Sequence, residues 1–177
     1  MIPVHLTSRE RVNSSVSDVE SLHPSAQRVA NALQSRGVKG PFREFSVPTK
    51  SAADAASALG CEVGAIASTL VFIVDDDPVV VIKSGAFRVD LEKLREKAGG
   101  AKVRQASPDE VRDATGQSIG GVSPVGWPQP LTTFIDDSLR QYEIVWAACG
   151  TPNAVFRTSF DELQSITGAI VISLRPS

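Results

Sequence analysis

The sequence has few of the side chains that metal, redox and histidine-based chemistry require. Its 177 residues include two histidines, two cysteines, one tyrosine and one methionine. A structural zinc site needs four Cys or His ligands, whereas His5 and His23 lie far upstream of both cysteines. A Ser–His–Asp triad would have to recruit one of these two histidines. We therefore predict no metal, no cofactor and no histidine-based nucleophile.

The two cysteines and the apolar runs bear on where the protein works. Cys61 and Cys149 are 88 residues apart, so the chain has no C-x-x-C redox motif. One long-range disulfide is an alternative, but apolar flanks are more typical of two buried thiols in a cytosolic protein. No run of 18 apolar residues predicts a membrane span, and the N-terminus lacks the apolar core of a signal peptide. We expect a cytoplasmic protein with no membrane partner.

The length fits one domain. Residues 1–20 are polar, Ser-rich and without a clear period, which predicts an N-terminal arm, and residues 21–177 are interpreted as the folded domain. The β-branched runs 69–74 and 79–82 flank the turn residues 75–78 and predict a central β-hairpin. Further strands are expected at 42–47, 131–135, 143–148, 154–157 and 169–174.

Capping residues predict short helices between these strands. Pro24 suits the first turn of an amphipathic helix that ends near Gly37, and an alanine-rich helix over 51–59 ends at Gly60. Ser107 and Ser159, each followed three residues later by Glu, read as capping boxes, and Asp90 is a further cap. The pattern predicts an α/β (α+β) single domain. Its core would be a mixed, mostly antiparallel central sheet, or a partial barrel, flanked by short helices.

Residues 116–130 form the least ordinary segment, with four glycines and three prolines in fifteen positions. The pair Gly120–Gly121, followed by Ser-Pro-x-Gly, can present backbone N–H and C=O groups to a ligand. A plain connection between a helix and a strand explains this composition equally well.

Five segments in order resemble the YbaK and prolyl-tRNA synthetase-associated editing domains, from about His23 to Leu174. They are SAADAASALGCEVGAIASTLVF (51–72), GAFRVDLEKL (85–94), GGVSPVG (120–126), FIDDSL (134–139) and ACG (148–150). Within them Gly120 and Pro124 fit a G-x-x-x-P loop, Asp136 falls on the family's acidic residue, and Gly150 falls on a strand glycine.

The resemblance implies a YbaK-like fold and a trans-editing hydrolase that deacylates mischarged tRNA. The ester would carry a small amino acid, such as alanyl or cysteinyl, on a tRNA of the prolyl type. The acceptor end of the tRNA is the implied partner, with an aminoacyl-tRNA synthetase as a further candidate. The implied catalytic residues are Gly120, Gly121, Asp136 and Ser68, and the implied substrate-binding residues are Lys83, Lys50, Val122, Ser123, Pro124 and Gly150.

One position departs from the family. The family usually has lysine where this chain has Ser68, and the resemblance gives that lysine a contact with the terminal adenosine or its phosphate. Lys50 and Lys83 are the cations available to replace it; Lys83 is also explained as a solvated strand end. The alternative function is a non-catalytic module that binds aminoacyl-tRNA or a synthetase.

A local excess of basic residues gives a second candidate for RNA contact. Residues 83–104 contain seven basic and three acidic side chains, although the whole chain has a net charge of −2. A solvated helix face explains such a cluster. The resemblance adds a contact with the tRNA backbone as the functional interpretation.

Overall fold

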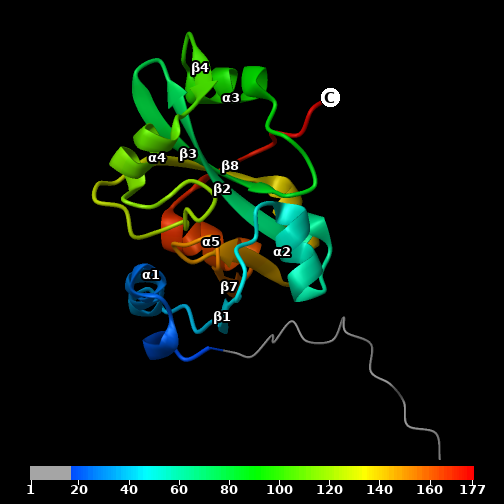
Figure 1. Cartoon of the computed structure of the whole chain (residues 1–177). Coiled ribbons are helices and arrows are strands. Elements are labelled where there is room, and N and C mark those ends of the chain that lie inside the picture. Colours follow the sequence, from blue (N-terminus) through cyan, green and yellow to red (C-terminus); the bar gives the residue numbers. More distant parts are fainter. Residues whose placement is uncertain (1–16) are drawn as a thin grey trace, which may run out of the picture.

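The computed structural model describes residues 17–177, so most of the predicted arm lies outside the described residues. Eight strands form one open, mixed sheet in the order β1-β7-β6-β2-β3-β5-β8, with β4 on the edge of β2 (Figure 1). The strands are β1 (Phe42–Glu44), β2 (Ile66–Val74), β3 (Asp77–Ser84), β4 (Val103–Gln105), β5 (Thr132–Asp136), β6 (Val145–Ala148), β7 (Ala154–Thr158) and β8 (Ile170–Ile172). Four of the strand pairs are antiparallel and three are parallel. The predicted α/β fold with a mixed sheet is confirmed.

The central hairpin forms as predicted, with a tighter turn. β2 and β3 pair from Ala67 opposite Ser84 to Val74 opposite Asp77. The turn consists of Asp75 and Asp76, and Asp75 has a φ of 55°, a conformation that Asp tolerates better than most residues. Pro78 therefore lies in β3 and not in the turn.

The helices are short and end where the sequence signals predict. They are α1 (Pro24–Ser35), α2 (Ala52–Leu59), α3 (Leu91–Ala98), α4 (Pro108–Thr115) and α5 (Phe160–Thr167), with 3₁₀ turns η1 (Val19–Ser21), η2 (Val63–Ala65) and η3 (Asp137–Gln141). Ser107 and Glu110 form the predicted capping box. Ser159 accepts a hydrogen bond from the Glu162 N–H, but the Glu162 carboxylate bonds the Thr158 hydroxyl at 2.8 Å, so this second box is half formed. No helix among residues 17–177 is long and apolar enough to cross a membrane.

Two strands differ from the prediction. β1 ends at Glu44, and Val47, expected within it, is 68% exposed. The pairing stops there because the Asn153 N–H donates to the Thr151 hydroxyl oxygen at 3.3 Å, and the Asn153 side-chain amide takes its place at the Phe45 carbonyl at 3.0 Å. β4 escapes prediction because it has three residues, two of them exposed and polar.

Both cysteines are free thiols, so the disulfide alternative is wrong. Cys149 is fully buried, and its Sγ lies 3.5 Å from the Ala26 carbonyl oxygen. Burial raises the pKa of the Cys149 thiol to about 12. Cys61 is half-buried, and burial raises its pKa as well.

The edges of β2 are covered unequally. One edge pairs with β3 along nearly the whole strand. On the other edge β6 pairs only with Ile66 and Ala67, and β4 pairs only with residues 72–74. The Ala106 N–H, directly after β4, bonds the Val71 carbonyl. Residues 68–70 therefore lie along an uncovered edge, and the candidate site lies against this gap.

Candidate functional site

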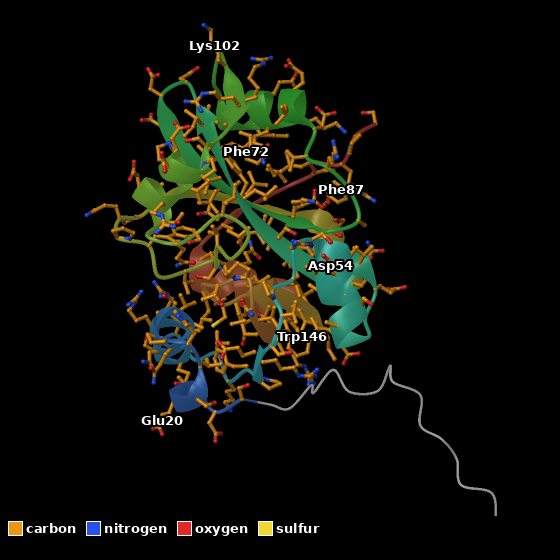
Figure 2. All side chains as sticks on the ribbon, in the orientation of Figure 1. Glu20, Asp54, Phe72, Phe87, Lys102 and Trp146 are labelled. Carbon is orange, nitrogen blue, oxygen red and sulfur yellow. The ribbon has the colours of Figure 1, made fainter. Side chains whose placement is uncertain are left out.

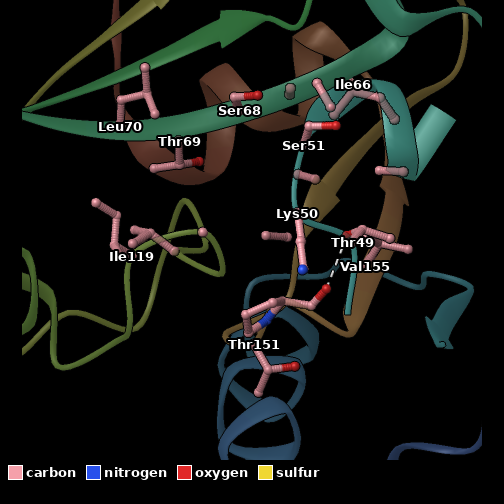
Figure 3. A pocket seen from close by; sticks show the side chains of 18 of the residues that line it. Thr49, Lys50, Ser51, Ile66, Ser68, Thr69, Leu70, Ile119, Thr151 and Val155 are labelled. Atoms are coloured by element: carbon pink, nitrogen blue, oxygen red, sulfur yellow. Dashed lines mark hydrogen bonds between the residues drawn. The ribbon is translucent and has the colours of Figure 1, made fainter. Parts of the chain in front are cut away.

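A cavity of about 250 Å³ lies against the uncovered stretch of β2 (Figure 3). Its wall is built from segments far apart in the sequence, chiefly residues 49–52, 66–71, 105–106, 119–120 and 146–148. Val71, Ala106, Val111, Val122 and Ala147 make its buried part apolar. The size and the small apolar side chains suit a small organic group rather than a large side chain.

Lys50 is a cation at the edge of this cavity. Thr49, the residue before Lys50, is held in place because its N–H and its hydroxyl both donate to the Pro152 carbonyl at 3.0 Å. Ser51 then caps α2 through its hydroxyl. Lys50 is exposed and lines the cavity between these anchors, and its ammonium group lies on the side of Thr151 (Figure 3). It is therefore placed to meet an anion that approaches the opening.

Ser68 lines the cavity, but Lys83 is turned to other partners. Lys83 lies directly opposite Ser68 in the hairpin. Its ammonium donates to the Phe87 carbonyl at 2.5 Å and lies 5.8 Å from the centre of the Phe87 ring. Burial lowers the pKa of Lys83, and the charge of Arg88 lowers it further. Of the two candidate replacement cations, Lys50 is the one in the cavity wall.

Only part of the glycine-rich loop (residues 116–130) lines the cavity. Gly120 and Val122 line it, and Gly121 lies against the neighbouring backbone, where an added Cβ would come within 2.4 Å of the Thr151 carbonyl carbon. Close backbone approach therefore explains this glycine. Ser123 and Pro124 are buried outside the cavity wall.

The polar groups of Ser123 are used within the loop. Its N–H donates to the Gln117 side-chain oxygen at 2.7 Å, and its hydroxyl donates to the Val125 carbonyl. The Gln117 amide nitrogen donates to the same carbonyl at 3.0 Å. These bonds give the loop a fixed shape and leave Ser123 as a residue that supports the loop.

Asp136 and Gly150 lie away from the cavity wall. Asp136 is fully buried and accepts hydrogen bonds from the Ser138 N–H at 2.9 Å, the Ser138 hydroxyl and the Leu174 N–H at 2.7 Å. Gly150 has a φ of 87° and packs on α1, where a Cβ would meet Val29 Cγ2 at 2.7 Å. The structure thus groups Ser68, Lys50, Gly120 and Val122, and it leaves the other predicted residues outside the wall.

Several cavity residues were missed by sequence reasoning. Thr69, Thr151, Gln105 and Ile119 all line the cavity. Ile119 is 46% exposed. Its position directly before the glycine pair is the one sequence signal that could have identified it. Thr69 lies in an apolar strand run, where alternation alone does not show that the edge is open.

The basic cluster over 83–104 has many internal partners. Arg95 pairs with Glu92 at 2.5 Å, and Arg104 bonds both carboxylate oxygens of Glu110 at 2.7 and 2.9 Å. Lys102 lies at the top of the molecule, well above Trp146, which lines the cavity (Figure 2). These contacts favour a solvated face, and the RNA contact stays a prediction.

Comparison with known proteins places the chain in a family. Residues 46–166 match the aminoacyl-tRNA editing domain. An uncharacterised Bacillus subtilis protein, YwhH, is 32% identical over 70% of this chain and 79% of its own length. The proline–tRNA ligase of Ligilactobacillus salivarius is 27% identical over 67% of this chain, which spans only 23% of that enzyme. A crystal structure of a candidate trans-editing enzyme for prolyl-tRNA synthetase superposes with a TM-score of 0.84 and 45% identity, covering 89% of this chain and all of that one. The chain belongs to the aminoacyl-tRNA editing domain family.

Proposed function

We propose that this protein hydrolyses the ester bond of mischarged aminoacyl-tRNA in trans, with the acceptor end of a prolyl-type tRNA in the cavity. The observation that carries this is the cavity of about 250 Å³, apolar where it is buried and bearing Lys50 at its edge. The apolar part suits a small acyl group such as alanyl or cysteinyl. The related structure of a candidate trans-editing enzyme for prolyl-tRNA synthetase supports the same role and makes that synthetase the expected partner.

The proposed mechanism relies on backbone groups and on the substrate. An aminoacyl ester is already activated, so its hydrolysis needs a positioned water and donors for the developing oxyanion. Correct positioning contributes about 7–11 kcal/mol, and one oxyanion donor contributes about 2.7–4 kcal/mol. Gly120 and Val122 in the cavity wall are candidates to orient the ester and the water, with Gly121 holding the loop against Thr151. The vicinal ribose hydroxyl is the candidate proton relay, which accepts a proton from the attacking water and passes its own proton to the leaving ribose oxygen.

Lys50 is proposed to take the place of the lysine that the family has at position 68. It comes from a different segment but lines the same cavity as Ser68. An ammonium group at the edge can neutralise a phosphate of the terminal nucleotide while the acyl group lies further in. Ser68 then contributes a hydroxyl to the wall and is not a covalent nucleophile, because Ser68 is not paired with a histidine base in the sequence.

The decisive experiment is a deacylation panel. Purified protein is incubated with alanyl-, cysteinyl-, seryl- and prolyl-tRNA, and release of amino acid is compared with the spontaneous rate. The proposal expects faster release from at least one of these esters, reduced in Lys50→Met. Absence of release from every tRNA in the panel would exclude the hydrolase.

Ser68 favours one alternative, a non-catalytic module that binds aminoacyl-tRNA or a synthetase. This alternative expects acceptor-end analogues to bind without turnover. It also expects Ser68→Lys to gain hydrolysis, because the variant restores the family's residue in the cavity wall. Comparing binding and turnover in the two proteins separates the alternatives.

A further inference from the structure

The backbone groups of β2 alternate between its two edges. The Ile66 carbonyl accepts from the Gly85 N–H at 2.8 Å on the β3 side. The Val71 carbonyl accepts from the Ala106 N–H at 3.1 Å on the opposite side. Because successive residues of a strand direct their N–H and C=O groups to opposite edges, the odd-numbered residues face β6 and β4. Thr69 is the odd-numbered residue in the middle of the uncovered stretch.

Thr69 therefore presents a complete pair of backbone groups to the gap. The pairing with β6 ends at Ala67 and the pairing with β4 begins at Phe72. Among the hydrogen bonds of residues 17–177 outside the strand ladders, none involves the N–H or C=O of Thr69. The Thr69 hydroxyl, in a side chain only 8% exposed, also has no partner. Unpaired polar groups beside a cavity are costly unless a ligand or water completes them.

The uncovered stretch is too short for a peptide strand. It spans residues 68–70, about 10 Å at the usual rise per residue, because β6 closes one end and β4 with the following Ala106 closes the other. A ligand that fills it has the size of about one residue. This excludes strand addition, in which an extended peptide pairs along an exposed edge.

An aminoacyl ester is such a ligand. Its α-ammonium group is a donor and its carbonyl is an acceptor, with one carbon between them, as in a residue of a β-strand. We propose that Thr69 binds the aminoacyl group as an added strand residue, an inference that rests on the proposed function. The ligand ammonium donates to the Thr69 C=O, and the ligand carbonyl accepts from the Thr69 N–H.

This geometry also places the amino-acid side chain. Residues directly opposite in a sheet direct their side chains to the same face. The ligand side chain then lies on the face of Ala67 and Val71, two buried residues of the cavity wall, next to the Thr69 side chain. The ribose lies toward Lys50. The strand edge thus recognises the common part of every aminoacyl ester, and the wall limits the size of the variable part.

The test uses non-hydrolysable analogues, in which an amide joins the acyl group to 3′-amino-3′-deoxyadenosine. The alanyl analogue is compared with the propionyl analogue, which lacks the amino group, and with the β-alanyl analogue, which moves it by one carbon. Calorimetry is expected to show binding at least about ten-fold weaker for both than for alanyl. Hydrogen exchange is expected to show protection of the Thr69 amide by the alanyl analogue. The Leu70 amide, which faces β3, serves as the internal control.

Thr69→Val is the matched variant, because it removes the hydroxyl, retains the shape and leaves the backbone groups in place. It is expected to keep the preference for alanyl over propionyl. Replacing Thr69 with its α-hydroxy acid removes only the N–H, and is expected to weaken binding of the alanyl analogue.

The outcomes separate this inference from the proposed function. Equal binding of the three analogues, with an unprotected Thr69 amide, overturns the strand-edge inference even when charged tRNA is hydrolysed. Selective binding and Thr69 protection without tRNA hydrolysis uphold the inference and exclude the enzyme. Absence of binding by all three analogues overturns the inference, and the deacylation panel then decides the function alone.

Discussion

Ser68 and Lys83 lie directly opposite each other in the β2–β3 pairing, yet only Ser68 lines the cavity. The Lys83 ammonium is held by the Phe87 carbonyl at 2.5 Å. A cation one strand away from the substituted position therefore already has its own partner. The cation in the cavity wall is Lys50, which precedes α2.

Replacement of Lys50 should affect catalysis more than replacement of Lys83. Lys50→Met is expected to lower kcat/KM for aminoacyl-tRNA by about ten-fold, since hydrogen bonds to charged groups contribute about 1.5–3 kcal/mol. Lys83→Met keeps most of the apolar stem and should change kcat/KM less than two-fold. Steady-state deacylation by both variants tests this, and a larger loss in Lys83→Met would contradict the assignment.

Ser68→Lys should lower the stability of the protein, because its ammonium would lie next to the charge of Lys83. The new ammonium would stand opposite Lys83, and like charges directly opposite in an antiparallel pair destabilise it by roughly 0.2–1 kcal/mol. Urea unfolding should show this loss in Ser68→Lys and its recovery in the double variant with Lys83→Met. If the single variant were as stable as the parent and Lys83→Met added nothing, the two side chains would not interact.

The capping box of α4 should respond to acid. The Arg104 guanidinium and the Ser107 N–H lower the pKa of Glu110 from its ordinary value of 4.5 to about 2. A carboxyl with a lowered folded-state pKa stabilises the fold above its unfolded pKa, and this contribution is lost as the pH falls through the folded value. The Tm difference between the parent and Glu110→Gln should therefore be constant above about pH 5.5, roughly one unit above that ordinary value, and shrink from there to pH 2. A difference that stays constant down to pH 2 would argue against the pairing.

Local signals predicted the helices and the central hairpin better than the short strands and their ends. The hairpin and the caps at Asp90 and Ser107 follow from short-range chemistry that the sequence displays directly. β4 could not be predicted, because three residues with two exposed polar side chains acquire strand geometry only by pairing with β2. The end of β1 is likewise set by tertiary contacts, because Asn153 offers its side-chain amide in place of its N–H to the Phe45 carbonyl.

The site was predictable only in part, for a related reason. Ser68, Gly120, Val122 and Lys50 could be named from motifs, and all four line the cavity. Asp136 matched its motif equally well, but its oxygens are used by Ser138 and Leu174. A motif identifies a residue type at a position; the partners that occupy its polar atoms depend on the tertiary structure. Thr69 was missed because an uncovered strand edge has no sequence pattern.

The close packing of Gly121 should make the loop sensitive to one methyl group. A Cβ there would lie 2.4 Å from the Thr151 carbonyl carbon, so Gly121→Ala must move backbone. Overpacking of this kind costs about 1–3 kcal/mol, and the displaced loop should reduce deacylation. Gly37→Ala is the control, because an added Cβ at Gly37 has nothing within 4 Å, while its φ of 88° strains an alanine. It should lose stability with deacylation unchanged, whereas similar activity in both variants would show that the loop tolerates the shift.

Variants of Asp136 test whether the motif that contains it has a catalytic or a structural role. Its carboxylate is fully buried and joins the end of β5 to the segment after β8 through the Leu174 N–H. Asp136→Ala leaves buried donors without an acceptor and should cost about 3 kcal/mol of unfolding free energy. Asp136→Asn keeps one acceptor oxygen and should lose less. Because Asp136 lies outside the cavity wall, the folded Asn variant should retain deacylation within a few-fold below its Tm. A stable, folded Asp136→Asn protein with activity reduced a hundred-fold would instead show that the carboxylate acts on the substrate.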